Sequence, residues 1–249
     1  MAVMIITTII TTTATETTTI TAITTTTIDG AAVSGAPLLR LLAWLSPAFP
    51  LGGFSYSGGL ERAVHDGLLK HAGDLELWLA TGLEHGFLWN DAVLLAASHR
   101  VGDDDIGAIA ALAAALAGSR ERHAETLALG AAFITAASAW PSPVLEALPA
   151  ETALPVAFGA VAAAHGIGLE AACQGYLHAQ VSQSISAAIR LSLAGQVAGL
   201  SVLSALEANI LAATARAAAS SLDDLGGCTF RADIAVLGHE TQHSRLFRS

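Results

Sequence analysis

The chain has 249 residues, of which 53% are hydrophobic and only 13% charged, so it can bury an extensive core within one large domain. Its 21 acidic residues against 11 basic ones give a net charge of -10, and no basic stripe is present to follow a phosphate backbone. This balance argues against nucleic acid as a partner. The two cysteines, Cys173 and Cys228, form no C-x-x-C pair, and this usage favours a reducing cytoplasm over a disulfide framework.

The mean hydropathy of +0.58 raises the question of membrane spans. Two long runs carry no charge, at residues 171–189 and 191–206. The first contains several glutamines and serines, and the second is shorter than the roughly 20 apolar residues that a bilayer span needs. We interpret both runs as buried helices of a soluble protein and expect no membrane partner.

The N-terminal part has an unusual composition. Between residues 7 and 28 threonine alternates in clusters with isoleucine and alanine, and no Lys or Arg precedes the apolar part, as an export signal would require. Such a stretch can form an aggregation-prone strand, stay disordered, or come from a misplaced start codon. We expect a disordered extension over residues 1–34 without a functional role, a folded domain over 35–238, and a terminal segment over 239–249.

Helical signals dominate the chain after residue 35. The prolines and paired glycines of residues 46–53 interrupt the first helix, because proline disfavours helical geometry before it. Asp74 is the expected N-cap of a helix whose apolar residues recur near the 3.6-residue period. In this half we expect helices at 37–45, from about 57, at 75–87 and at 92–99, with a break at 90–91.

The second half continues the helical pattern. Acidic residues at 103–105 and Ser119 are expected to cap two helices, and Pro155 stands where a first-turn proline belongs. Almost nothing alternates with period two outside the threonine tract. We expect helices at 106–117, 120–140, 155–165, 169–189 and 191–219. The sequence therefore predicts an all-α single domain of about nine or ten packed helices, in two layers or a bundle.

The terminal segment HETQHSRLFRS begins with the H-E-x-x-H pattern, in which two histidines four apart hold zinc and the glutamate acts as general base. Here His239 and His243 would be the ligands and Glu240 the base. A catalytic zinc needs a third protein ligand, and residues 244–249 contain no His, Asp, Glu or Cys. We favour an exposed tail that matches the pattern by chance and expect no metal or cofactor. A zinc-dependent hydrolase remains the alternative.

Two charged features have open interpretations. Arg190 is the only charge between Glu170 and Glu207, and an unpaired guanidinium in an apolar core would be costly. It therefore either forms an internal ion pair or lies exposed on a helical face, where it can bind a partner. The charged stretch 119–125 is expected to be the solvated first turn of a helix.

Five segments resemble, in order and spacing, the urease accessory protein UreF family. They are SPAFPLGGFSYSGGLE at 46–61, the helix from Ser119-Arg120 to Gly130, PVAFG at 155–159, AIRL at 188–191 with Gly195-Gln196, and the terminal HETQHSRLFRS. Tails of this family usually carry tyrosine where this chain has His243, so the zinc pattern is one substitution away from a docking tail. The family's R-L-x-P-L-G-Q is here RLSLAGQ at 190–196, without its proline, which puts the local helix break in doubt.

The resemblance implies an all-α, non-catalytic adaptor. Proteins of the family dimerise, bind UreD (called UreH in some species), and together recruit the GTPase UreG, which couples GTP hydrolysis to nickel delivery into apo-urease. By motif, the terminal segment would dock into UreD, with Leu246 and Phe247 as anchors and Arg245 paired with an acid of the partner. The other residues of this docking segment are His239, Glu240 and Arg248. With less support, the UreG-facing surface would contain Tyr56, Glu61 and Arg190.

Overall fold

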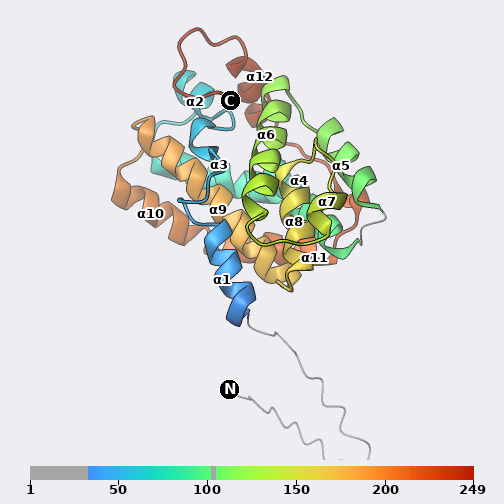
Figure 1. The fold of residues 1–249 in the computed structure, drawn as a ribbon. Helices are drawn as coiled ribbons and strands as arrows, with labels where there is room; N and C mark the ends of the chain where they lie inside the picture. Colours follow the sequence, from blue (N-terminus) through green and yellow to red (C-terminus); the bar gives the residue numbers. More distant parts are fainter. Residues whose placement is uncertain (1–32, 102–104) are drawn as a thin grey trace, which may run out of the picture. The chain divides into compact units, whose positions relative to one another are not determined.

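Helices make up all the regular structure in the computed structural model, which describes residues 33–101 and 105–249 (Figure 1). Residues Val33–Ser249 form one compact unit, and the extension expected at 1–34 lies almost wholly outside the described residues. The elements are α1 (Gly35–Trp44), η1 (Gly53–Ser55), α2 (Leu60–His65), α3 (Ala72–His85), α4 (Phe87–Arg100), α5 (Ile106–Ala115), α6 (Arg120–Ala137), α7 (Val144–Ala147), α8 (Leu154–Ala164), α9 (Leu169–Arg190), α10 (Gln196–Ala205), α11 (Glu207–Ala219), η3 (Leu222–Asp224) and α12 (Phe230–His239).

The all-α prediction is confirmed within this part of the chain. The helices of the described residues slightly exceed the nine or ten expected. The structure adds the single-turn helix α7 and the helix α12, and it divides the helix expected over 191–219. None of the described helices is by itself long and apolar enough to cross a membrane. The bent pair α10 and α11, which meet at 41°, reaches those limits only when taken together.

Helix α8 lies at the centre of the fold, between α4 and α6 (Figure 1). Every residue from Leu154 to Ala162 is buried, so this short helix has no polar face. Its Phe158 joins an aromatic cluster with Trp44 and Phe133, in which ring centroids lie 5.3 to 6.2 Å apart. The packing of these rings holds α1, α6 and α8 together at the centre of the fold.

Two expected helix boundaries are wrong. Residues 90–91 do not break the chain, because α4 runs through Asn90 and Asp91 without interruption. Asp74 is not an N-cap. His71 is the N-cap of α3, and Asp74 is its third residue, whose carboxylate accepts from the backbone N–H of His71 at 3.2 Å. Asp91 is stabilised inside α4 by Arg122 from another helix, whereas Asp74 acts within one turn, as the third residue of a capping box.

The helix expected over 191–219 is divided in the structure. The chain leaves helical geometry at Ser192, whose φ is 60°, and α10 begins only at Gln196. The backbone N–H of Ser192 donates to Ile189 and that of Leu193 to Ala188, each at 3.0 Å, so the end of α9 is closed by local hydrogen bonds. The break therefore forms without the proline that the family pattern carries there.

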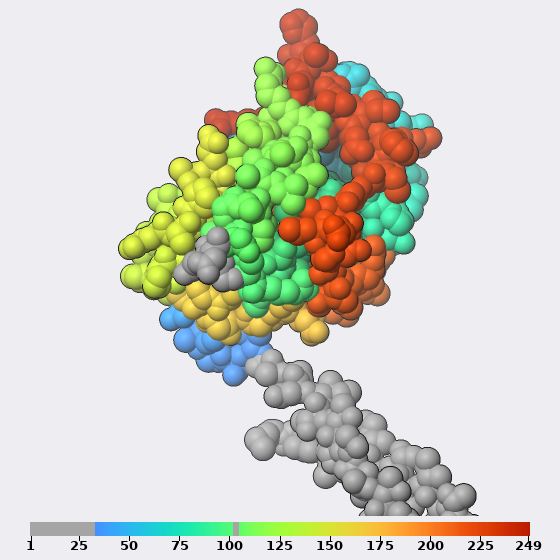
Figure 2. Space-filling model, turned by 90° about the vertical axis from the view of Figure 1, so that its right-hand side faces the viewer, coloured from blue at the N-terminus to red at the C-terminus, as the bar shows by residue number. Residues whose placement is uncertain are grey.

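One end of the molecule brings together segments from three distant parts of the sequence. Helix α2, helix α12 and the N-terminal end of α6 lie side by side there, with the last residues of the chain returning among them (Figure 1). The space-filling view shows the red C-terminal residues spread over the surface next to the green of α6 (Figure 2). This end contains most of the residues that the family resemblance singles out.

Candidate functional site

The terminal segment 239–249 folds back onto its own chain and does not extend as a free tail. The backbone N–H of Arg248 donates to the carbonyl of Ser55 at 2.8 Å, and the N–H of Ser57 donates to the carbonyl of Ser249 at 2.9 Å. Phe247 is only 4% exposed and Ser249 only 2%. The segment is therefore paired with residues 55–57 by backbone hydrogen bonds and anchored by an aromatic side chain.

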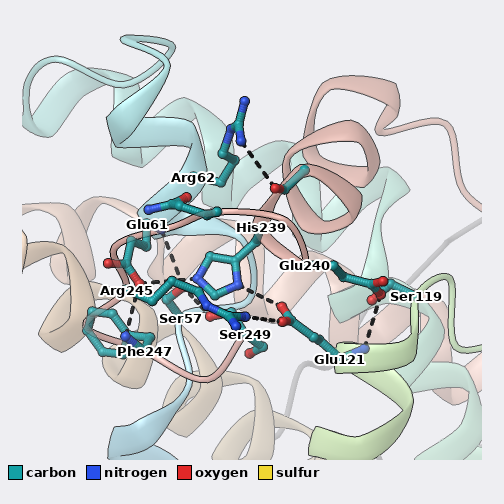
Figure 3. Close-up of polar contacts among 12 residues, drawn as sticks. Ser57, Glu61, Arg62, Ser119, Glu121, His239, Glu240, Arg245, Phe247 and Ser249 are labelled. Atoms are coloured by element: carbon teal, nitrogen blue, oxygen red, sulfur yellow. Dashed lines mark hydrogen bonds and ion pairs between the residues drawn. The ribbon is translucent and has the colours of Figure 1, made fainter.

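Glu61 of α2 binds the backbone of the terminal segment. Its carboxylate accepts the backbone N–H groups of Leu246 at 2.6 Å and of Phe247 at 2.9 Å (Figure 3). Burial by itself would raise the pKa of Glu61, but these two N–H groups and His239 outweigh it and hold the pKa below its ordinary value. Glu61 is 7% exposed, so it stabilises the segment and is not the surface residue that the resemblance implied.

His239 joins two helices through both of its ring nitrogens. Nδ1 lies 2.6 Å from a carboxylate oxygen of Glu121 in α6, and Nε2 lies 3.2 Å from one of Glu61 in α2 (Figure 3). The side chain has no exposed surface. Only the doubly protonated ring can donate to both carboxylates at once. Arg245 also pairs with Glu121, so the guanidinium of this residue neutralises that acid.

The zinc pattern does not form a site in this fold. Helix α12 ends at His239, so His243 lies beyond the helix and the two histidines do not share one helical face. Both nitrogens of His239 are engaged by carboxylates, whereas His243 is exposed. Within residues 33–101 and 105–249 no group of three or more His, Cys, Asp or Glu is arranged to hold a metal ion. The expectation of an exposed tail is wrong for His239 and correct for His243.

Glu240 caps a helix, which is a different role from that of a general base. Its carboxylate accepts the backbone N–H of Arg120 at 2.8 Å and of Glu121 at 3.3 Å, at the start of α6. Ser119 is the N-cap of the same helix and accepts from the N–H of Arg122 at 3.0 Å, as the sequence predicts. A negative charge at a helix N-terminus is favourable, because the first N–H groups have no partner inside the helix.

The charged stretch 119–125 is buried at its far end, so the prediction of a solvated turn is wrong there. Arg122 donates to Asp91 at 3.0 and 3.2 Å and to Glu125 at 3.1 Å, and Tyr176 donates to Asp91 at 2.8 Å. Burial by itself would lower the pKa of Arg122, but the charges of Asp91 and Glu125 outweigh it and raise that pKa. The pKa of Tyr176 is also raised, mainly by burial and next by the nearby charge of Asp91. The hydroxyl of Ser249 donates to Glu125 at 2.8 Å, which connects this cluster to the terminal segment.

Sequence reasoning missed Asp91, Arg122 and Glu125 as parts of the site. One signal was available in the sequence: Asp91 is the only acid in the apolar stretch 87–97, and a buried carboxylate requires a cation as its partner. It also missed Glu121, which carries the contacts of both His239 and Arg245.

Arg190 lies exposed at the end of α9, over the terminal segment. Its guanidinium is 4.3 Å from the ring centroid of Phe247 and donates a hydrogen bond to the carbonyl of Phe54. No carboxylate of the described residues pairs with it, so the internal ion pair is not formed there. Of the two interpretations, the structure retains the exposed one, with the aromatic ring in place of an acid.

The outer side of α12 is apolar and adjoins the terminal segment. Phe230, Ile234 and Leu237 recur at helical spacing and are 73%, 67% and 52% exposed, and Leu246 is 56% exposed. A cleft of about 410 Å³ between α3 and the start of α12 extends this surface toward Leu77 and Trp78. We call Phe230, Ile234 and Leu237 the apolar stripe, and Leu246 is a further exposed apolar residue in the terminal segment. Large exposed apolar patches commonly mark protein interfaces.

Comparison with known proteins agrees with the sequence resemblance. The chain matches the model of the UreF family over residues 69–207. It is 61% identical over 214 residues to the urease accessory protein UreF of Rhizobium etli (strain CIAT 652), which covers 85% of this chain and 96% of that protein. The corresponding protein of Agrobacterium fabrum is 58% identical over 222 residues, covering 88% of this chain and all of that protein. That of Rhizobium meliloti is 56% identical over 214 residues. This chain belongs to the urease accessory protein UreF family.

Proposed function

We propose that this protein is the non-catalytic adaptor of a urease activation complex in the cytoplasm. As a homodimer without a cofactor of its own, it binds UreD (UreH) and, together with it, recruits and regulates the GTPase UreG, so that nickel is inserted into apo-urease. Family membership supports the accessory role, and the resemblance of the terminal and opening motifs suggests the partners.

The apolar stripe beside a fixed terminal segment is the observation that carries the UreD part of the proposal. The segment has two sides: His239, Phe247 and Ser249 are buried in their own chain, whereas Leu246 and Arg248 are exposed. We therefore assign the buried residues, together with Glu240, to holding the shape of the segment. The exposed residues and the stripe on α12 dock into UreD. Phe247 is buried in its own chain and fixes the position of the segment.

The UreG side of the proposal rests on Tyr56 and Arg190. Tyr56 lies in the loop between α1 and α2. Arg190, at the end of α9, contacts that loop through Phe54 and the terminal segment through Phe247. Glu61 is buried against the terminal segment and is only 7% exposed, so the proposed UreG surface does not include it. A nucleotide-dependent partner is regulated when one of its conformations binds this surface better than the other.

Co-purification of the tagged protein with UreD and UreG from the same genome tests the proposal. The variant Ile234→Asp introduces a charge into the apolar stripe, and Leu39→Asp on α1 is a matched control, because the two side chains are 67% and 68% exposed. We expect Ile234→Asp to lose UreD and Leu39→Asp to retain it, with both thermal unfolding midpoints unchanged. Retention of UreD by Ile234→Asp would remove the stripe from the interface, and wild-type protein that captures neither partner would contradict the adaptor function.

A further inference from the structure

A second cavity, separate from the apolar stripe, lies between the loop after α1 and helix α9. Its volume is about 510 Å³, within the range of pockets that bind ligands or side chains. The loop residues 44–56 form one wall, and the polar side of α9 forms the other. The side chains from α9 that line it include His178, Gln180, Ser182, Gln183, Ser186 and Arg190.

The cavity wall is held in place by residues of the opening motif. Phe49 packs against Phe133 and Trp140, with ring centroids 5.9 and 6.4 Å apart. Gly52 has a φ of 73°, which favours glycine, and a side chain at Gly53 would lie 2.6 Å from the amide of Gln183. The two glycines thus bring the loop close to α9, and the cavity exists before any partner arrives.

The charge of the lining differs from that of the whole chain. The sequence contains 21 acidic residues, but no Asp or Glu lines this cavity, whereas Arg190 lies on its rim. The polar side chains of the lining include His178, Gln180, Gln183 and Ser186, all of which can donate hydrogen bonds. A lining with an arginine on its rim, several hydrogen-bonding side chains and no carboxylate favours an occupant with a negative charge.

The side chain of Arg190 is already positioned to bind such an occupant. One nitrogen of its guanidinium is bound to the carbonyl of Phe54, and its plane is supported by the ring of Phe247. The planar group has five N–H donors, so several remain for a carboxylate after the contact with Phe54. Because the side chain is already positioned, little conformational freedom is lost when a partner binds. Phe54, 72% exposed on the rim, offers an aromatic contact beside it.

We infer that this cavity takes an acidic side chain presented by UreG, with the carboxylate at Arg190 and the adjoining residues of UreG over Phe54. The inference rests on the proposed function, since it gives the UreG surface its chemistry. The charge complementarity between a carboxylate-free lining and an acidic side chain is the reason for choosing this occupant.

A charge placed on the cavity lining tests the inference. Ser186 is exposed on α9 and lines the cavity, so Ser186→Glu can introduce a carboxylate without disturbing the core, and Ser186→Gln is the uncharged control of equal size. Binding of purified UreG to the UreD complex of each variant is measured by titration calorimetry at low and high salt. We expect Ser186→Glu to weaken binding about tenfold at low salt, Ser186→Gln to stay near wild type, and the difference to shrink at high salt.

The outcomes separate the inference from the proposed function. Equal affinities for the two variants would overturn the inference while the wild-type complex upheld the adaptor role. A halved native mass of Ser186→Glu with unchanged UreG affinity would overturn it as well, by assigning the cavity to a second copy of this chain. Binding of free sodium glutamate with millimolar affinity that leaves UreG affinity unchanged would mean a small-anion site and would also overturn it. No wild-type complex with UreG would overturn both.

Discussion

His239 shows how a single side chain can hold two helices to the terminal segment. Its ring lies between the carboxylates of Glu61 and Glu121, and both of those acids are themselves largely buried. The free energy of such a cluster depends on all partners being present, since removing one leaves a buried charge without compensation.

We therefore expect His239→Ala to destabilise the protein by about 3 kcal/mol or more, because two carboxylates lose their shared partner. The other histidine of the HETQH motif is the matched control. His243 is exposed, and His243→Ala is expected to change the free energy of unfolding by less than about 0.5 kcal/mol. Urea unfolding of both variants measures the difference, and equal midpoints would show that the two contacts of His239 contribute little.

Glu61 makes the stability of the fold sensitive to acid. Its pKa is lower in the folded chain than in the unfolded one, so its contribution is fully present above the ordinary glutamate pKa of about 4.3 and is lost as pH falls through the folded value. We expect Glu61→Gln to be less stable at pH 7 and to show a flatter decrease in stability below pH 5. Urea midpoints measured between pH 3 and pH 7 check this, and parallel curves for the two proteins would contradict it.

The sequence identified Glu61, Arg190 and the terminal segment but not their contacts. Glu61 binds the backbone of Leu246, 185 positions away, and no local pattern indicates which distant N–H groups will reach a carboxylate. The exposure of Arg190 was one of two open possibilities for the same reason. The residues were found through the family motifs, whereas their burial required the fold.

At the scale of elements, one glycine decides how closely α6 approaches the segment before α8, and a second glycine in α5 provides a control. A side chain at Gly130 would lie 1.9 Å from the carbonyl oxygen of Thr152, which is backbone and cannot move aside. We expect Gly130→Ala to cost about 1–3 kcal/mol through overpacking. Gly107 in α5 meets no described atom within 4 Å, so Gly107→Ala is expected to leave the stability unchanged or raise it by up to about 1 kcal/mol. Thermal unfolding distinguishes the two, and similar midpoints would contradict the close approach.

The helices themselves were largely predictable from periodicity and capping signals. The start of α6 at Ser119 and the first-turn proline of α8 agree with the structure, because both depend on neighbours within one turn. The expected break at 90–91 failed, because Asp91 is stabilised inside α4 by Arg122 from another helix. Helix α12 was not predicted, although Phe230, Ile234 and Leu237 recur at helical spacing, and the structure places these side chains on its exposed side.

At the scale of the whole molecule, the terminal segment connects parts of the chain that are otherwise far apart in sequence. Its contacts reach residues 55–57, Glu61 of α2 and the first turn of α6, including the cap by Glu240. Removal of residues 239–249 therefore takes away structural contacts as well as partner-binding residues.

We expect the chain truncated after Gly238 to lose hydrogen-exchange protection in α2 and in the first turn of α6, while α8, buried from Leu154 to Ala162, remains protected. The substitution Leu246→Asp is the appropriate comparison, because that side chain is 56% exposed and only its backbone N–H binds Glu61. It should keep the protection of α2 and lose UreD. If the truncated chain retained full protection in α2, the terminal segment would be dispensable for the fold, and its loss of UreD binding would then report recognition alone.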